Sequence, residues 1–564
     1  MKNGIARFST IVLTLTFAAS AFSQQKAIVH SLGVTSLTQA HQREATTQFS
    51  GKAHEALRPM PDPRVAKGTR AASIFSTAGQ KTEFSVVGAD KTERGFTGLT
   101  SNDSNVANGG GLNGVLEPPD QGLATNSTQV FETVNLALRI YTNGGKPLSP
   151  AIGIAAFFGV PVAPVDPYNN LSDPRVFFDA KSKRFFFSIL EYQQDPNTGA
   201  FLGSEDLLAV SQTSDATGNY YIYLIDGCPA DNESCLADQP LIGLNDDGFY
   251  FSNNDFDANG GFLGARIVAL DREALVSNTP VNGISYVLPN DFSVEPALPA
   301  PGAVTTQNDG TEYFTESLDF GPPANGNSLR IFALTGTETL ENSPMTNLAT
   351  SDFPTEAYSS PYPANQKAGA YPLGQQFGDS EEYLNPDDDR MLQLYYAGGK
   401  LYTTLETLTP DADAPFPTTS AAWFVIQPTA TTTTVSAHIA KQGYIGIADG
   451  SVLYPAFAVN SSGKGIIGFS FSGSKYYPST GYVHFSGGAI GSEVHTAGAG
   501  QNPEDGFTGY PQFGGKYVSR WGDYSAAFVA PDGGLWFAAE YIPNDIVYPR
   551  TSLTNWGTFV SHVQ

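Results

Sequence analysis

The sequence predicts an all-β protein, a β-propeller that is preceded by a flexible N-terminal leader. Composition, a repeated strand pattern and the spacing of that pattern lead to this prediction. The chain has 564 residues, with 58 Gly, 38 Pro and 12% aromatic residues, while only 15% are charged. Because soluble domains average about 25% charged residues, this composition favours a turn-rich β protein over a helical bundle or a disordered chain.

A repeated unit starts at Val115 and recurs to the end of the chain. Each unit has a short strand, a polar turn rich in Gly, Asn or Asp, an aromatic strand and a third strand of alternating apolar residues. The turns centre on seven positions: 126, 182, 247, 309, 398, 462 and 532. Their spacing runs from 56 residues (126 to 182) to 89 residues (309 to 398), which suits four short strands with their loops.

Sheets of this size need neighbours, because an isolated sheet exposes both of its faces and both of its edges. Radial stacking covers the faces, and it is the arrangement of a β-propeller. Seven repeats predict seven blades, with six or eight left open, and a pair of β-sandwiches is the alternative. In a ring, the segment after Val115 and the last strand of the chain lie side by side.

Residues 1–23 have the features of a signal peptide. Lys2 and Arg7 precede an apolar, Thr-rich stretch (residues 8–19), and Ala19-Ser20-Ala21 offers a cleavage site. The stretch is too short to span a bilayer comfortably, and nothing later approaches the roughly 18 apolar residues of a spanning helix. We therefore expect an exported protein, secreted, periplasmic or at the cell surface, with no membrane span after signal removal. A retained anchor is the alternative.

The region between the signal peptide and the first repeat differs from the rest of the chain. Residues 24–95 carry ten Lys or Arg against six Asp or Glu, and residues 102–114 are rich in Gly and Asn. An extended or disordered leader with a linker is expected over 24–114, followed by the propeller over 115–564. A basic strap docked on the acidic body, or a removable pro-segment, is the alternative for the leader.

Charge and cysteine content limit the partners. The net charge of −25 repels phosphate backbones, so no nucleic-acid partner is expected. Cys228 and Cys235 enclose a polar hexapeptide, and an oxidising compartment favours a disulfide between them. Two cysteines are too few for a structural zinc site of cysteine ligands. A monomer is expected.

Short motifs across residues 115–560 point to one group of proteins. They include Glu117-Pro-Pro-Asp120 near the start and Arg520-Trp-Gly-Asp-Tyr-Ser525 near the end. In this order they resemble secreted bacterial β-propeller proteins that carry an EPPD segment early and a WGDYSA segment late. That group is largely without an assigned activity, so the resemblance implies a fold and export, and no particular reaction.

Two turns resemble the Asp-box of sialidase-type propellers, S-x-D-x-G-x-x-W. Asp246-x-Gly248 and Asp532-x-Gly534 share its centre, while other residues replace its Ser and its Trp. Asx-Gly turns also arise wherever a hairpin needs positive φ. We therefore interpret both as structural turns, and no arginine triad for a sialic-acid carboxylate can be assembled from the sequence.

The candidate binding residues are placed by the repeat. Four aspartates start the first strand of their units: Asp120, Asp173, Asp238 and Asp523. If these strands are innermost, the carboxylates ring one mouth of the central channel, near Arg175, Arg520, Trp521 and Tyr524. Such a mouth can hold a cation or bind sugar hydroxyls against an aromatic face, and carboxylates about 5–10 Å apart allow hydrolysis. The alternative is that the carboxylates accept backbone hydrogen bonds and only tie the blades together.

Calcium is the one metal that the sequence suggests, and no cofactor is required. Asp255, Asp257 and Asn259, followed by Gly260, match the first half of a calcium loop, but Arg266 stands where an EF-hand needs a bidentate acid. An Asx-rich turn is the alternative. The acidic cluster Asn385–Asp389 is expected to be a solvated loop.

The histidines of the predicted propeller show no ligand spacing. They are His438, His484, His495 and His562. H-E-x-x-H, G-x-S-x-G and P-loop motifs are absent from the sequence, which disfavours zinc hydrolases, serine hydrolases and nucleotide chemistry. The leading hypothesis is an exported binding module for an extracellular glycan or protein at the channel mouth. The alternative is a glycoside hydrolase or polysaccharide lyase that uses the same mouth.

Overall fold

The computed structural model describes residues 22–46, 83–112, 114–162, 166–228, 234–304, 306–319, 326–342, 344–410 and 417–563. The predicted signal peptide lies almost wholly outside these residues. Helices are short: α1 (Leu37–Thr46), α2 (Ser101–Ala107), α3 (Ile154–Phe158), α4 (Arg272–Ser277), α5 (Pro372–Phe377) and the 3-10 turns η1 (Thr337–Glu341) and η2 (Pro511–Phe513). Among the described residues, no helix has the length and apolar character needed to cross a membrane.

The antiparallel pairings divide the strands into seven units of four, and further pairings of β17 with β22 and of β25 with β26 join the fourth, fifth and sixth units into one larger sheet. The first three units are β5 (Gly122–Thr125), β6 (Gln129–Val134), β7 (Ala137–Thr142) and β8 (Ile152–Gly153); β9 (Asn169–Asp179), β10 (Arg184–Gln194), β11 (Phe201–Ser211) and β12 (Asn219–Asp226); and β13 (Cys235–Leu244), β14 (Gly248–Asp257), β15 (Phe262–Asp271) and β16 (Gly283–Leu288). The fourth and fifth are β17 (Glu295–Pro299), β18 (Thr311–Ser317), β19 (Ser328–Thr335) and β20 (Asn347–Pro354); and β22 (Leu394–Ala397), β23 (Lys400–Thr409), β24 (Thr418–Ala430) and β25 (Val435–Ile447).

The last two units complete the series. The sixth is β26 (Gly450–Val459), β27 (Lys464–Gly473), β28 (Tyr476–Ser486) and β30 (Glu493–Thr496), with β29 (Ala489–Ile490) beside β28. The seventh is β32 (Ala526–Val529), β33 (Leu535–Tyr541), β34 (Gly557–Val563) and β4 (Arg94–Thr100). Two short strands, β21 (Tyr383–Leu384) and β31 (Val518–Ser519), pair with each other outside the units. Each of the seven predicted turns joins the first and second strands of one unit.

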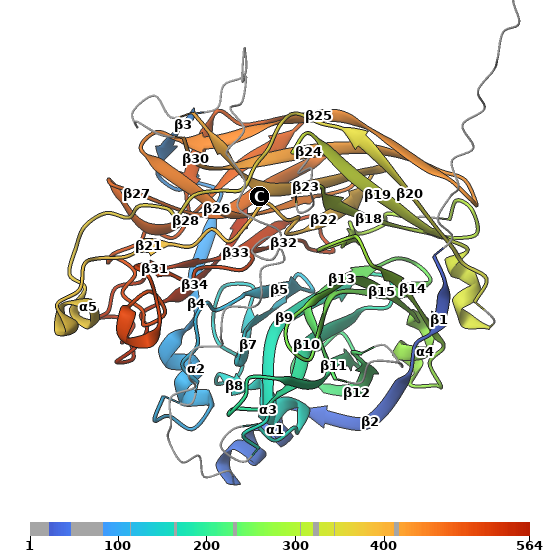
Figure 1. Cartoon of the computed structure of the whole chain (residues 1–564), viewed down its shortest axis with the longest axis horizontal. Helices are drawn as coiled ribbons and strands as arrows, with labels where there is room; N and C mark the ends of the chain where they lie inside the picture. The colour runs from blue at the N-terminus through green and yellow to red at the C-terminus, as the bar shows by residue number, and fades with distance from the viewer. Residues whose placement is uncertain are drawn as a thin grey trace, which may run out of the picture.

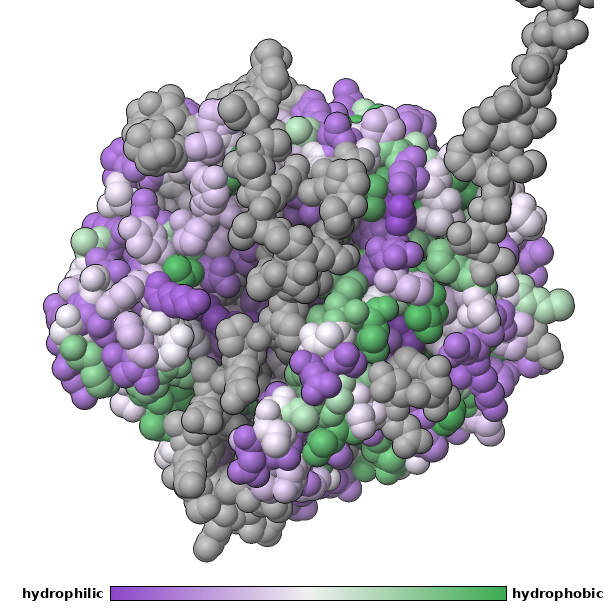
Figure 2. Space-filling model, in the orientation of Figure 1, coloured by the Kyte–Doolittle hydropathy of each residue, from purple (hydrophilic) through white to green (hydrophobic). Residues whose placement is uncertain are grey.

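The innermost strands contact one another in a closed cycle: β5, β9, β13, β17, β22, β26, β32 and back to β5. The sheets therefore surround a common axis, as Figure 1 shows. The predicted all-β propeller is confirmed, and its first and last inner strands lie side by side. The face seen in Figure 2 carries mostly hydrophilic side chains, with apolar groups in separate areas.

Parts of the predicted leader belong to the sheets. β1 (Gln24–Lys26) pairs with β16, β2 (Val29–Ser36) pairs with β12, and β3 (Glu83–Val87) pairs in parallel with β30. β4 supplies the outer strand of the seventh unit. An extended leader is one of the two forms expected over 24–114; the other, a flexible or disordered leader, is wrong for these paired segments. The physical reason is that the outer edge of each blade has unpaired backbone groups, which added strands satisfy. Residues 47–82 lie outside the described part.

Aromatic side chains of the second strands fill the spaces between the units. Phe186 of the second unit stacks on Phe249 of the third, with ring centroids 5.2 Å apart. Phe131 of the first unit lies 5.2 Å from Phe187 of the second. Such pairs contribute about 0.5–1.5 kcal/mol beyond the burial of their area. The aromatic strand of the repeat is therefore the strand that packs blade against blade.

The predicted disulfide is present. Cys228 and Cys235 are bonded, and Cys235 is the first residue of β13. The bond closes the connection between the second and third units at the end where β13 enters the ring. The disulfide that was predicted from an oxidising compartment is therefore confirmed.

Candidate functional site at the mouth of the central channel

The inner strands enter the ring through a strained backbone position. In six units a non-glycine residue there has positive φ: Asp120 (50°), Asp173 (58°), Gln239 (52°), Ser293 (50°), Tyr454 (50°) and Asp523 (50°). In the second, third and sixth units this residue lies at an irregularity in the strand register. Non-glycine residues adopt this conformation in only a few per cent of cases, with Asp and Asn favoured. This shared positive-φ position therefore recurs near the entry of the inner strand in six units.

Three of the four predicted aspartates occupy this position. Asp120 and Asp523 lie just before β5 and β32, whereas Asp173 lies inside β9 at a break in its register, and Asp238 lies inside β13, one residue before the equivalent Gln239. The prediction that all four aspartates start the first strand is therefore wrong for Asp173 and Asp238, because β9 and β13 extend four and three residues further toward the N-terminus. Asp523 is an electrostatic neighbour of both Asp120 and Asp173, and Asp238 interacts with Asp173. The four carboxylates therefore form one electrostatically linked group, and their role as a binding mouth stays a prediction.

Burial and mutual repulsion make these carboxyl groups weak acids. Burial, followed by the charge of Asp523, raises the pKa of Asp173 to about 6. The same two causes raise the pKa of Asp120 well above its usual range, and burial and the charge of Asp173 do so for Asp238. A carboxyl of this kind gains most when a cation or a hydrogen-bond donor reaches it, because the charged form then becomes less costly. The mouth is thus built to interact with donors or cations.

Three arginines offset part of the negative charge. Arg520 forms an ion pair with Asp523. Arg390 pairs with Asp388 and donates to Gln239 Oε1 at 2.7 Å. Arg175 lies flat over the ring of Tyr524, 3.4 Å from its centroid. The mouth therefore offers acceptors and donors side by side.

The aromatic residues of the mouth do not present a ring face to a ligand. Trp521 and Tyr524 are both fully buried. Trp521 packs in a cluster with Tyr454 and Leu453, and one face of Tyr524 is covered by Arg175. The expected aromatic platform for a sugar is wrong. Both rings are covered by neighbouring side chains of the protein.

Asn135 links two of the carboxylates. Its Nδ2 donates to Asp120 Oδ2 at 2.5 Å, and its Oδ1 accepts from the backbone N of Asp173 at 2.9 Å. Asp120 thus ties the first unit to the second, as the structural alternative expected. The other carboxylate oxygen of Asp120, Oδ1, is buried and has no hydrogen-bond partner among the described residues. This oxygen remains available as an acceptor for a ligand.

Sequence reasoning missed part of the mouth. The segment Asn385–Asp389, expected to be a solvated loop, is largely buried, with Asp388 2% and Asp389 0% exposed. Asp387 also has positive φ, 58°, and Arg390 pairs with it at 2.9 Å. The expectation of a solvated loop is wrong because Arg390 neutralises the cluster. Arg390 directly follows three aspartates in the sequence, and this arrangement was the signal that the acidic cluster could be neutralised and buried.

Two cavities lie along the inner strands. The smaller has a volume of about 30 Å³ and is lined by residues in or directly before the inner strands of six units, among them Gln121, Arg175, Ile242, Glu295, Gln393 and Ser525. The larger has a volume of about 390 Å³ and lies beside the turns that follow β9, β13 and β17. There the lining includes Phe177, Phe178 and Val304, and an ion pair of Lys181 with Asp246. Arg175, which lines the smaller cavity, is an electrostatic neighbour of Asp173, so the group of carboxylates beside this cavity is the candidate site.

The predicted calcium residues lie on a hairpin between β14 and β15. Asp255 is buried in an ion pair with Arg266, at 2.9 Å, and Asp257 Oδ1 accepts from the backbone N of Asn259 and Gly261. The predicted Asp-box positions are turns too, since Asp532 Oδ1 accepts from Gly534 N. Calcium binding at the hairpin stays a prediction, which a rise in the melting temperature on adding calcium after chelation would test.

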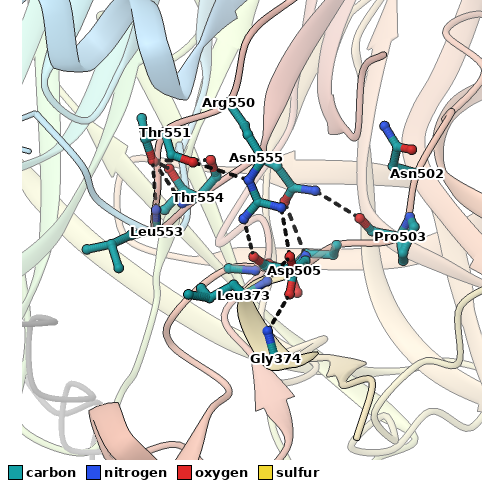
Figure 3. A network of polar contacts seen from close by, with 12 residues as sticks. Leu373, Gly374, Asn502, Pro503, Asp505, Arg550, Thr551, Leu553, Thr554 and Asn555 are labelled. Atoms are coloured by element: carbon teal, nitrogen blue, oxygen red, sulfur yellow. Dashed lines mark hydrogen bonds and ion pairs between the residues drawn. The ribbon is translucent and has the colours of Figure 1, made fainter. Parts of the chain in front are cut away.

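A second group of buried acids lies beside the mouth. Asp505 is fully partnered: it accepts from the backbone N of Leu373 and Gly374 and pairs with Arg550 at 2.7 Å (Figure 3). Its neighbour Glu504 is buried, and the group's mutual repulsion adds to burial in raising the pKa of Glu504 to about 7. Ionisation of Glu504 is therefore unfavourable in the folded protein, and we expect the free energy of unfolding to depend on pH.

No family model matches the chain, and no curated protein matches it. Solved structures give distant likenesses. A protein of unknown function from Dyadobacter fermentans is 9% identical with a TM-score of 0.36, over 71% of this chain and 96% of that one. An exo-β-1,3-galactanase from Clostridium thermocellum is 11% identical with a TM-score of 0.29, over 79% of this chain and 92% of that one.

A mutant Trypanosoma rangeli sialidase that displays trans-sialidase activity is 10% identical with a TM-score of 0.31, over 78% of this chain. The alignment spans 59% of the sialidase chain.

Proposed function

We propose that this protein is an exported binding module that takes a hydroxyl-rich extracellular glycan at the carboxylate mouth. One observation carries the proposal. Four interacting aspartates, three from the first three units and one from the seventh, lie beside three arginines: Asp120, Asp173, Asp238 and Asp523. Export is supported by the signal-like residues 1–23 and by the Cys228–Cys235 disulfide.

The chemistry of the mouth selects the ligand class. Sugar hydroxyls donate and accept at once, and the mouth pairs carboxylate acceptors with guanidinium donors. Asp523 and Arg520 are the accessible members, each with 22% of its side chain exposed. With Trp521 and Tyr524 buried, binding depends on hydrogen bonds rather than on stacking. Ligands are therefore expected to be recognised by the pattern of their hydroxyls.

Binding to a panel of polysaccharides and oligosaccharides, measured by calorimetry, tests this proposal. Asp523→Asn keeps the shape and tolerates positive φ, but it removes the charge and the ion pair. We expect it to weaken binding by about tenfold or more, since a hydrogen bond to a charged group contributes about 1.5–3 kcal/mol. Asp246→Asn, in the lining of the larger cavity, is the matched control. Equal binding by both variants, or none by the wild type, would contradict the proposal.

Hydrolysis or elimination of a glycan at the same mouth is the second candidate. The observation that favours it is the contrast between Asp173, whose pKa is raised to about 6, and its neighbour Asp523, which is ion-paired with Arg520. Paired carboxyls in unequal environments suit a general acid and a charged partner. Release of reducing ends or unsaturated products, lost in Asp173→Asn, would support catalysis, whereas glycan binding without turnover would support the binding module alone.

A further inference from the structure

The side chains of Asp90, His484 and His495 meet on the outer part of the sixth unit. Each offers a ligand atom, and these atoms all lie within 4.8 Å of one another. His484 Nε2 lies 3.2 Å from Asp90 Oδ2, and the two imidazole rings have centroids 5.1 Å apart. None of the three takes part in the channel mouth.

The strand register explains why they meet. His495 on β30 pairs directly with Tyr482 on β28, and His484 follows Tyr482 by two residues, so both imidazoles lie on one face of the sheet. On its other side His495 pairs with Val87 of β3. Asp90 follows three residues later, in the turn that leads from β3 to β4.

One atom of this cluster lacks a partner. His495 Nδ1 is buried and makes no hydrogen bond within the described part of the chain. A buried nitrogen left in this way costs free energy, and native proteins rarely tolerate it. His484 and Asp90 have about a third of their side chains exposed, 35% and 32%, so an ion can reach the cluster from solvent.

We propose that Asp90, His484 and His495 bind a divalent first-row transition-metal ion, with Zn²⁺ as the probe. Two imidazoles and one carboxylate suit zinc, cobalt or nickel, whereas calcium and magnesium prefer oxygen ligands alone. Three protein ligands leave at least one position for water. The ion holds the turn after β3 against the sixth unit, just before the chain crosses to the seventh as β4.

Zinc titration of the chelator-treated full chain, without a histidine tag, tests the site. We expect binding of one ion, and a Co²⁺ derivative with visible absorption bands of nitrogen and oxygen coordination. His484→Ala and His495→Ala should weaken binding by more than the roughly 10–100-fold that loss of an outer partner of a ligand costs. His438→Ala, an exposed histidine on β25, is the control. Absence of binding by the wild type, or equal binding by all variants, would overturn the site.

Amide hydrogen exchange tests whether the bound ion also holds the turn after β3 against the sixth unit. Zinc should slow exchange of residues 83–100 in the wild type and in His438→Ala, but not in His495→Ala. Asp90→Asn, which keeps the size of the side chain, should behave like His495→Ala. Matching melting temperatures of all variants without metal would show that they fold. Zinc binding with unchanged exchange over 83–100 would overturn the holding role.

Discussion

Asp120 and Asp523 occupy the same place in two neighbouring units, each with φ of 50°, although one starts the first inner strand and the other starts the last. Their electrostatic interaction is therefore a direct consequence of ring closure. The contact of β32 with β5 and the hydrogen bond from Gln121 Nε2 to the backbone O of Tyr524, at 2.8 Å, hold the two segments together. The candidate site depends on this closure, because three of its four aspartates come from the first three units and Asp523 comes from the last.

Asn135→Ala tests the link between the first and second units. The change removes the hydrogen bonds to Asp120 Oδ2 and Asp173 N and leaves buried polar groups unpaired. We expect the free energy of unfolding to fall by about 1–3 kcal/mol. Asn143→Ala, at an exposed turn where the side chain donates to Ser127 O, should change it by less than about 0.5 kcal/mol. Urea unfolding measures both, and equal effects would contradict the role of Asn135.

Stability is expected to fall as the pH rises from about 5 to about 8. Burial raises the pKa of Glu504 to about 7 and that of Glu295 to about 8. In this range the folded protein therefore holds more protons than the unfolded chain, in which such groups titrate near 4.3. The free energy of unfolding then decreases with pH. Melting temperatures across this range measure the effect, and a higher melting temperature at pH 8 than at pH 5.5 would contradict it.

Glu504→Gln isolates one source of this pH dependence. The variant keeps the shape but cannot ionise, so the penalty above pH 7, on the order of 3 kcal/mol for a carboxyl raised to that value, should disappear. The dependence of stability on pH should become shallower. Glu338→Gln, an exposed residue of η1, serves as the control and should leave the dependence unchanged.

Truncation tests the part of the N-terminal region that closes the ring. A chain that begins at residue 101 lacks β4 and leaves β34 without its outer partner. It also loses the fully buried Leu99. We expect a loss of more than about 3 kcal/mol from apolar burial and hydrogen bonds together, and a broader unfolding transition. A chain that begins at residue 94 retains β4 and should unfold cooperatively. Calorimetry distinguishes the two, and identical transitions would show that β4 is dispensable.

Much of the architecture could be predicted from local sequence. Polar turns between an apolar strand and an aromatic strand predicted seven hairpins, and each of these turns joins two strands of the structure. The same pattern placed Asp120 and Asp523 just before their inner strands, but it put the start of β9 at Asp173, four residues after the strand begins. What the repeat could not give was the burial of Trp521 and Tyr524, because neighbouring units decide which side of an inner strand is covered.

The N-terminal segments and the histidine cluster show the same limit. β1, β2 and β3 have no pattern of their own that specifies a partner, and each pairs with the open edge of a unit far along the chain. His484 and His495 have no ligand spacing along the chain, yet the register of β28 with β30 places them on one face. The partner Asp90 reaches them only because β3 docks beside β30.

The sequence by itself determined the class of fold, the turns of the repeated units and the disulfide. These features follow from side-chain pattern and backbone preference within a few residues, so they need no knowledge of distant neighbours. Only the tertiary structure decided which carboxylates meet, which aromatic rings are hidden and which strands complete the outer edges. Those outcomes depend on contacts between residues hundreds of positions apart, and their geometry is set when the ring closes.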